Sequence, residues 1–502
     1  MNTTLKKILS VILLLNVYCI ATAEKTFGKT FFTQRSQGSN AARENVGVLH
    51  LFPLCDMDCI NGLLSATPMY SRSFKSADLG TYLFFNGTNS MQFGPAGTAD
   101  VFGRNFFLND NFNGTATITP LVQNFLVDFD FRLGLDEWVT GLYIKAHAPI
   151  VWTSWNTQLA TSNETTGTFI PEFAFGNLIE AASPVTNLIQ AFSGQTINTG
   201  TFPDLKTTLA YGRIDGGRTH VTVADVEVAL GYNFICNECS YLGFNIRTIF
   251  PTGNRPDAVY LFEPIVGNGH HYELGGGIDA HYEFWNNCDS SLGIYTNANI
   301  YHIFNAKQRR IFDLTANGVG SSRLLIKQFS DPTTYASTMF FGPNILALEC
   351  NVKNDLHVDA AFTLDYKRRG LTIDIGYNVW ARSKDIITIT QKIDENTFAL
   401  AGQTLGTGST TADQTGSTAR IDGSGGAPEA TPIFISNDDL NPDSAATPNA
   451  LTNKLFAHVG YTWEHLEYMP FFGIGGEVEL SGSQNNALNQ WAVWAKGGFS
   501  FI

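Results

Sequence analysis

The chain has 502 residues and a formal net charge of −14, with 15% charged and 13% aromatic side chains. The acidic balance argues against nucleic acid or an anionic membrane surface as the partner. The charged fraction is low for a soluble surface, while this length allows either several soluble domains or one large barrel.

The N-terminus has the pattern of a secretory signal peptide over residues 1–23. Lys6 and Lys7 precede an apolar run at residues 8–20, and Ala21-Thr22-Ala23 supplies a small-x-small cleavage site. Beyond this segment, no run approaches the roughly 18 to 20 apolar residues that a spanning helix requires. If the mature chain lies in a membrane, we expect it to do so as a barrel.

Residues 24–78 lack strong alternation of apolar and polar side chains. The sequence leaves open whether this segment is a periplasmic lead-in or a small plug that enters the barrel. We expect the barrel itself, with its long loops, to occupy residues 79–502.

Clear alternation begins at residues 125–151, FLVDFDFRLGLDEWVTGLYIKAHAPIV. In an extended strand Phe125 and Phe129 share one face, while Asp128 and Asp130 share the other. The two alternating runs flank a short turn and therefore predict an antiparallel hairpin. Similar pairs of runs recur at residues 225–247, 271–300, 356–379 and 455–480.

The connections between these runs differ in length at the two ends of the hairpins. Short turns fall near residues 136, 237, 287, 368 and 466, and long polar connections lie near 152–220, 251–270, 305–343 and 383–452. The runs predict about 12 strands, with an early strand drawn from residues 79–85 or 101–108. Residues 386–390 (IITIT) could raise the number to 14 or 16, which is also within the even-numbered range.

With these features the chain resembles the bacterial outer-membrane β-barrels, porins in particular. The final stretch QWAVWAKGGFSFI supports the resemblance, since such barrels end in an aromatic residue and Phe501 is penultimate here. The resemblance implies an all-β, transmembrane, antiparallel up-and-down barrel in the Gram-negative outer membrane. It also implies the lipid bilayer and the barrel-assembly machinery as partners, and leaves a monomer or a homotrimer open.

The polar face of the predicted strands supplies candidate pore-lining residues. They are Asp128, Asp130, Arg132, Lys145, Asp225, Glu227, Arg247, Glu273, Asp279, Glu283, Asp359, Asp365, Asp374, Glu477 and Glu479. Acids prevail, and a wall of that sign in a narrow aqueous pore favours cations. The alternative is that these charges pair across strands and hydrate the interior. Residues 177–194 have helical spacing and could form either a constriction or an exposed loop helix.

Tryptophans and cysteines lie at the predicted short turns. Trp138, Trp285 and Trp463 would form an aromatic girdle at the membrane interface. Cys55 with Cys59 and Cys236 with Cys239 are candidates for local or inter-turn disulfides, since the chain is exported and a zinc site would need a second CxxC.

The sequence contains no motif for an enzyme, a cofactor or a metal site. His271, Glu273 and His281 share a strand face, and lumen-facing histidines explain them better than a metal. We therefore expect a porin-like channel for passive diffusion of small hydrophilic solutes or ions, with a preference for cations. The alternative is a plugged surface barrel that acts as an adhesin or a structural envelope protein. A barrel that transports hydrophobic substrates would need an apolar pocket in its lumen. The acidic polar face of the predicted strands argues against this function.

Overall fold

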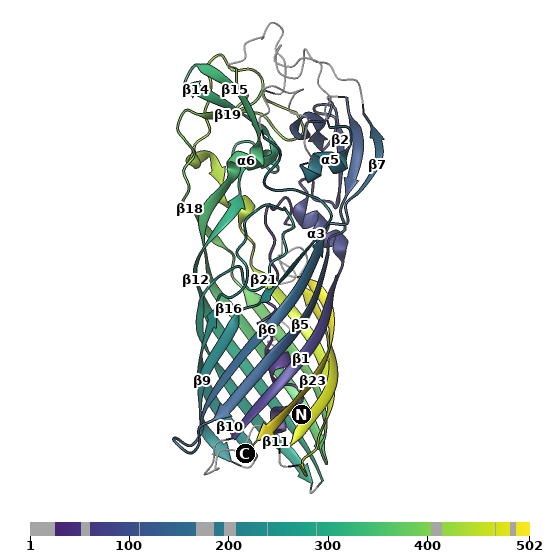
Figure 1. The fold of residues 1–502 in the computed structure, drawn as a ribbon, viewed down its shortest axis with the longest axis vertical. Helices are drawn as coiled ribbons and strands as arrows, with labels where there is room; N and C mark the ends of the chain where they lie inside the picture. Colours follow the sequence, from purple (N-terminus) through teal and green to yellow (C-terminus); the bar gives the residue numbers. More distant parts are fainter. Residues whose placement is uncertain are drawn as a thin grey trace, which may run out of the picture.

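The chain folds into a closed antiparallel β-barrel with a folded cap at one end (Figure 1). The computed structural model describes residues 26–51, 61–109, 111–166, 185–194, 207–237, 239–287, 289–402, 414–466, 468–481 and 488–501. The main sheet has 14 strands, of which β8 and β18 are side branches, so twelve strands form the ring. The predicted signal peptide, residues 1–23, lies outside the described residues.

Each ring strand pairs antiparallel with its neighbours along the chain, and β1 pairs with β23 to close the ring. The ring strands are β1 (Asn61–Phe74), β5 (Leu121–Gly134), β6 (Leu142–Asn156), β9 (Val226–Asn237), β10 (Ser240–Phe250), β11 (Glu273–Asn287), β12 (Ser290–Ile311), β16 (Ala347–Arg368), β17 (Leu371–Arg382), β21 (Ala450–Thr462), β22 (Pro470–Ser481) and β23 (Asn489–Phe501). Closure leaves no unpaired strand edge in the ring, which is the condition for a sheet to cross a bilayer.

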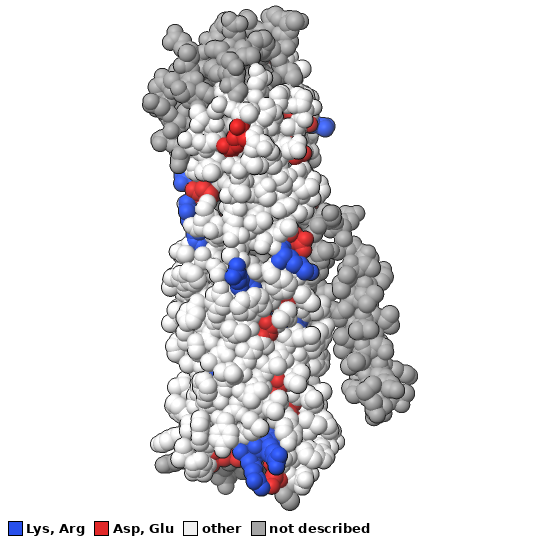
Figure 2. Space-filling view, turned by 90° about the vertical axis from the view of Figure 1, so that its right-hand side faces the viewer, with Lys and Arg blue, Asp and Glu red and all other residues white. Residues whose placement is uncertain are grey.

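The two faces of the ring differ because successive side chains of a strand alternate between outside and inside. On β5, Phe125 and Phe129 are exposed on the outer face, whereas Asn124 and Asp128 are buried on the inner face. The outer face carries many exposed apolar side chains, including Leu230, Phe244, Ile246, Ile278, Ile300, Ile375, Leu455, Ile474 and Val493. Figure 2 shows a band with few charged atoms on this wall, between basic groups at mid-height and at the lower end.

The connections at the two ends of the barrel are unequal in length. The short turns at residues 135–141, 238–239, 288–289, 369–370 and 463–469 lie at one end. The connections at residues 75–120, 157–225, 251–272, 312–346 and 383–449 lie at the other end, and their described parts build the cap. The connection between β22 and β23 is at the same end. We call these the turn end and the loop end.

The cap has its own sheets and helices, drawn in the upper part of Figure 1. One lobe pairs β2 (Ser90–Gly94), β3 (Val101–Phe102), β4 (Asn113–Thr117) and β7 (Ala160–Thr165) and includes α3 (Ser76–Leu83), η2 (Gly103–Phe106) and α5 (Leu188–Ser193). The other lobe pairs β14 (Leu325–Asp331), β15 (Thr334–Phe341) and β19 (Phe398–Leu400) and includes η3 (Ser321–Arg323) and α6 (Gly342–Leu346). Smaller pieces are β8 (Gly217–Val223), β18 (Ile386–Ile389), β13 (Asp313–Leu314) paired with β20 (Leu440–Asn441), η4 (Asn437–Asp439) and α7 (Pro442–Ala445).

The lobes are held by hydrophobic cores that also include side chains of the barrel wall, such as Trp155 in the first and Val352 in the second. Phe93, Phe106 and Phe192 meet edge to face in the first lobe, with ring centroids 5.2–5.6 Å apart. Such aromatic contacts add to the burial of apolar surface that stabilises the lobe. The second lobe buries Ile326 and Leu346 in a separate cluster. The cap is therefore a folded unit on the barrel.

Residues 26–51 run through the barrel from the loop end to the turn end, and we call them the N-terminal segment. Near the loop end, Phe32 packs between Tyr82 and Trp155. Near the turn end, Val48 and Leu49 pack among side chains from the starts of β1, β10 and β22. Between these ends the segment contains α2 (Ala41–Asn45), and η1 (Leu49–Leu51) follows. From Thr30 to Leu49 every side chain is buried or half-buried.

The expected strand number is confirmed, but the position of the first strand is corrected. The barrel begins at Asn61, in β1, and not at residue 79; residues 79–85 and 101–108 belong to the cap. Alternation in β1 was hard to recognise because Ser65 and Thr67 fill inner positions and Pro68 lies on the outer face. Residues 386–389 form β18, which extends the barrel wall through β16 and adds no ring strand. No helix of the described residues is long and apolar enough to cross a membrane.

Candidate functional site: the filled lumen

Arg35 is the first charged contact between the N-terminal segment and the barrel wall. Its guanidinium donates to Asp359 at 2.7 Å and to Glu479 at 3.3 Å, and both carboxylates are buried. A third hydrogen bond goes to the amide oxygen of Asn378, 3.1 Å away. These contacts join the segment to β16, β17 and β22, so one side chain connects three wall strands.

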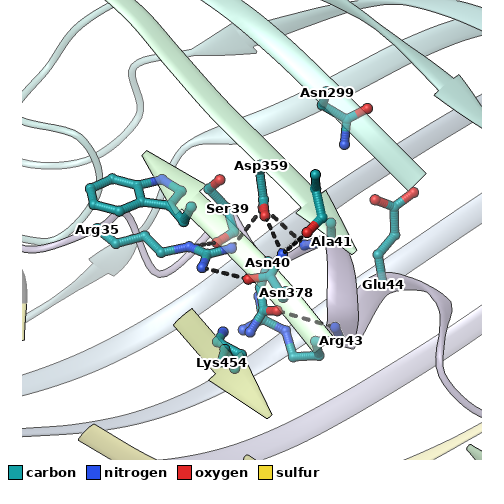
Figure 3. Close-up of polar contacts among 12 residues, drawn as sticks. Arg35, Ser39, Asn40, Ala41, Arg43, Glu44, Asn299, Asp359, Asn378 and Lys454 are labelled. Atoms are coloured by element: carbon teal, nitrogen blue, oxygen red, sulfur yellow. Dashed lines mark hydrogen bonds and ion pairs between the residues drawn. The ribbon is translucent and has the colours of Figure 1, made fainter. Parts of the chain in front are cut away.

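Helix α2 is held at both ends by charged wall residues. Asn40 is its N-cap and accepts from the backbone N–H of Arg43, while Asp359 accepts from the backbone N–H of Ala41 at 3.1 Å (Figure 3). At the other end Lys496 donates to the carbonyl oxygens of Arg43 and Glu44 at 2.9 and 2.8 Å. A carboxylate at the N-terminus and an ammonium at the C-terminus both match the polarity of a helix.

Arg43 and Glu44 connect the segment to the opposite side of the wall. Arg43 donates to Asp128 at 2.6 Å, and both side chains are buried. Glu44 lies 3.2 Å from both Lys145 and Arg247, and Arg247 is also 2.5 Å from Glu227. Each buried charge in this group therefore has an opposite charge within contact distance, which buried ions require.

The segment continues toward the turn end through a close backbone contact at Gly47. Its N–H donates to Asp374 at 2.6 Å. Its φ of +74° is in the left-handed region, and a Cβ there would lie 2.3 Å from the ring of His458. Only glycine adopts this backbone conformation readily and leaves room for the His458 ring.

The structure buries most of the predicted pore-lining residues inside the barrel or at its loop-end mouth. These are Asp128, Asp130, Lys145, Asp225, Glu227, Arg247, Glu273, Asp279, Asp359, Asp365, Asp374, Glu477 and Glu479. Arg132 and Glu283 are half-buried and lie near the turn end, with Arg132 4.6 Å from the ring centre of Tyr143. The sequence suggested that these charged side chains pair with one another across neighbouring strands. Several of the carboxylates also bind the N-terminal segment.

The sequence did not reveal the partners that the segment supplies. Arg35 and Arg43 lie in the stretch RSQGSNAAREN, residues 35–45. Apolar and polar side chains do not alternate there, so the stretch does not predict a strand. The available signal was the helix N-cap pattern of Asn40 before Ala41 and Ala42. A capped helical turn ahead of the first strand, with two arginines in a protein whose predicted inner wall is acidic, would have indicated a plug.

The three tryptophans predicted for a girdle lie at the turn end and are exposed. Trp138 is 72%, Trp285 45% and Trp463 38% exposed. A second group of exposed aromatic side chains lies toward the loop ends of β6, β10 and β12, where Trp152, Phe250 and Phe304 point outward. Two aromatic bands at the boundaries of an apolar belt are typical of transmembrane barrels.

Of the two kinds of disulfide expected for the turn cysteines, local or inter-turn, the structure excludes the local one between Cys236 and Cys239. Cys236 is disulfide-bonded, while Cys239 is free and exposed, so these two do not pair with each other. Cys55 and Cys59 lie outside the described residues. Of the predicted helix at residues 177–194, α5 is described, and it packs Leu188 and Phe192 into the cap core without entering the barrel. It is therefore not a constriction of the lumen.

The histidines considered as ligands do not converge. His271 hydrogen-bonds the carbonyl oxygen of Phe304 at 2.8 Å, and His281 stacks on Tyr295 with ring centroids 4.1 Å apart. Elsewhere, a cavity of about 20 Å³ remains between the segment and the wall, lined by Glu44, Asp130 and His147 among others. This volume holds about one water molecule.

No protein-family model matches the chain, and no curated protein matches it. Among solved structures, the chain is similar to an outer membrane channel from Pseudomonas putida F1, with 10% identity, 88% of this chain and 96% of that chain covered, and a TM-score of 0.34. It is also similar to the β-domain of a Bordetella autotransporter, with 9% identity, 88% and 100% coverage, and a TM-score of 0.31. A toluene transporter from Ralstonia pickettii has 10% identity, 95% coverage of both chains, and a TM-score of 0.29.

The geometry of the chain itself identifies its class. It combines a ring of twelve antiparallel strands, an outward apolar belt between aromatic bands, and short turns opposite long loops. The chain is a β-barrel of the bacterial outer-membrane type, and in this structure its lumen is occupied by its own N-terminal segment.

Proposed function

We propose that the protein is an outer-membrane channel for small hydrophilic solutes, closed in this conformation by the N-terminal segment. The observation that carries the proposal is the pairing of inner-wall carboxylates with a segment that is not part of the wall. Asp128 and Asp359 take their arginine partners from it. When the segment leaves, water replaces it against a polar wall, and the ring of strands stays intact.

The open channel would prefer cations. Acids prevail on the inner wall, where Glu227, Asp279 and Glu479 are examples. The segment contributes Arg35 and Arg43, so its departure removes positive charge from the lumen. A negative wall in a narrow pore raises the local concentration of cations.

The location that suits this function is the Gram-negative outer membrane, reached through a cleaved signal peptide. The turn end would then face the periplasm, and the cap would face the outside. The apolar belt and its aromatic bands support this placement, since they match the lipid-facing surface of a spanning barrel.

A second candidate is a permanently plugged surface barrel that displays the cap. The folded lobes favour it, because each has a hydrophobic core that a simple pore does not need. Phe32 also anchors the segment in the first of these cores, against Tyr82 and Trp155.

Conductance in a planar bilayer under a salt gradient separates the two candidates. The full mature chain and a variant without residues 26–51 are refolded in detergent, and the gel-mobility shift on heating verifies the barrel in both. The channel proposal predicts rare openings of the full chain and a sustained, cation-selective conductance of the variant. A folded variant without conductance would refute the channel and favour the surface barrel.

A further inference from the structure

Three potential metal ligands meet on the inner wall where β5 and β6 pair. Asp130 lies directly opposite His147 in the register, and Asp128 lies two residues along β5. One donor atom from each of the three lies within 4.8 Å of the others. Adjacent strands therefore bring two carboxylates and an imidazole to one point.

Each of the three side chains has one atom that makes no hydrogen bond: Oδ1 of Asp128, Oδ1 of Asp130 and Nδ1 of His147. Nδ1 of His147 and Oδ1 of Asp128 form an ion pair 3.5 Å long, whereas Oδ1 of Asp130 has no hydrogen-bond partner. Asp128 is only 2% exposed and Asp130 only 7%. A buried carboxylate oxygen without a hydrogen-bond partner is uncommon, and the one on Asp130 belongs to a cluster whose carboxylate–imidazole pair is too long for a normal hydrogen bond. Together they point to a ligand among the three side chains.

The remaining polar atoms of the same side chains are held by neighbours. Oδ2 of Asp128 accepts from Arg43, and Oδ2 of Asp130 accepts from Ser65 at 3.3 Å. Nε2 of His147 faces the carboxylate of Glu227 at 3.9 Å. Metal-binding side chains are typically oriented in this way, with a carboxylate behind the histidine and donors behind the carboxylates.

The spacing of one ligand pair matches that around a small divalent cation. Nδ1 of His147 lies 3.5 Å from Oδ1 of Asp128. Two ligands on a tetrahedral zinc ion with bonds near 2.1 Å are separated by about 3.4 Å. A set of one imidazole and two carboxylates suits zinc better than magnesium or calcium, which prefer oxygen alone.

We propose that Asp128, Asp130 and His147 form a divalent-cation site of the zinc class on the inner wall. The adjacent cavity of about 20 Å³ can supply a water as the fourth ligand. The carboxylates of Glu44 and Glu227 line the same cavity and offset the positive charge of Lys145. The site does not depend on the proposed channel activity, since the same geometry exists in a plugged barrel.

Stoichiometric zinc binding to the full mature chain tests the site. The protein is refolded with Zn²⁺ in detergent, free metal is removed by gel filtration, and bound zinc is measured by mass spectrometry. We expect one zinc per chain, none after His147→Ala, and a loss of tenfold or more in affinity after Asp130→Asn. Glu227→Gln should weaken binding by about 10–100-fold, the range for an outer-shell partner.

Controls separate this site from surface histidines. His465→Ala removes an exposed turn histidine and should leave the stoichiometry unchanged. Protein in which cobalt replaces zinc should show the visible absorption of a tetrahedral ion, and His147→Ala should abolish it. Absence of zinc from folded protein, or equal zinc with and without His147, would overturn the proposal. The heat-dependent gel mobility confirms that each variant has folded.

Discussion

Arg43 of the N-terminal segment and Asp128 of β5 form an ion pair 2.6 Å long, with side chains only 2% and 3% exposed. The pair joins a segment without strand structure to a strand of the ring. Because the pair is buried, loss of Arg43 leaves the charge of Asp128 to be offset by the more distant imidazole of His147, 3.5 Å away. The pair is one of several contacts that hold the segment inside the ring.

Removal of Arg43 should destabilise the closed barrel. We expect Arg43→Ala to lower the free energy of unfolding by about 3–5 kcal/mol, the range for breaking a buried ion pair. Denaturant titration in lipid vesicles, followed by tryptophan fluorescence, measures it. The matched control is Arg369→Ala, whose pair with Asp289 is exposed and should contribute nothing measurable. Equal effects of the two substitutions would show that the buried pair does not stabilise the barrel.

The outer wall should reject charge because it contacts lipid. Ile246 lies in the middle of β10 and is 61% exposed in the absence of lipid. We expect Ile246→Arg to cost about 2–4 kcal/mol, as for an arginine near the bilayer midplane. Refolding into vesicles at graded urea concentrations measures the cost. Thr334→Arg, on the exposed cap hairpin, is the control, and a cost as large as that of Ile246→Arg would argue against a lipid-facing wall.

Wall carboxylates should set the selectivity of the open channel. In the variant without residues 26–51, Glu227→Gln together with Asp279→Asn should move the reversal potential under a salt gradient toward zero. The reason is that both side chains lie on the inner wall and attract cations there. Asp331→Asn, on the exposed cap, should leave the potential unchanged. If the inner-wall pair has no effect either, these carboxylates do not select ions.

The cap should become less stable as the pH rises. Burial and the nearby Asp257 raise the pKa of Glu263 to about 8, compared with 4.5 when unfolded. Folded Glu263 keeps a proton that the unfolded chain loses between these values, so folding stability decreases from about pH 4.5 to about pH 8. Limited proteolysis at residues 251–272 should therefore be faster at pH 8 than at pH 5. Glu263→Gln should remove this contribution, and an undiminished pH dependence would contradict it.

The ring was predictable from the sequence because a lipid-facing wall imposes a period of two. Phe125, Asp128 and Phe129 alternate over β5, and similar runs predicted most of the hairpins. β1 was missed since its inner positions are Ser65, Thr67 and Ser71, small polar residues that also occur in loops. Alternation is visible only where the two faces differ strongly in polarity.

The filled lumen was less predictable because its contacts join residues far apart in sequence. Nothing in the local sequence of Arg35 indicates Asp359 or Glu479, which lie on distant strands. The same holds for His147, whose carboxylate neighbours Asp128 and Asp130 become adjacent only through the register of β5 and β6. The sequence predicted which residues face inward, and the fold decides what they meet.

Cysteine accessibility at Ser39 shows whether the N-terminal segment lies inside the barrel. Ser39 is buried and hydrogen-bonds His357 at 3.3 Å. In a Cys239→Ser background, Ser39→Cys is exposed to a bulky maleimide in reconstituted vesicles, with Thr334→Cys as the accessible control. We expect the cysteine at position 39 to stay unlabelled until the protein is denatured. Labelling as fast as at position 334 would contradict this expectation and place the segment outside the lumen.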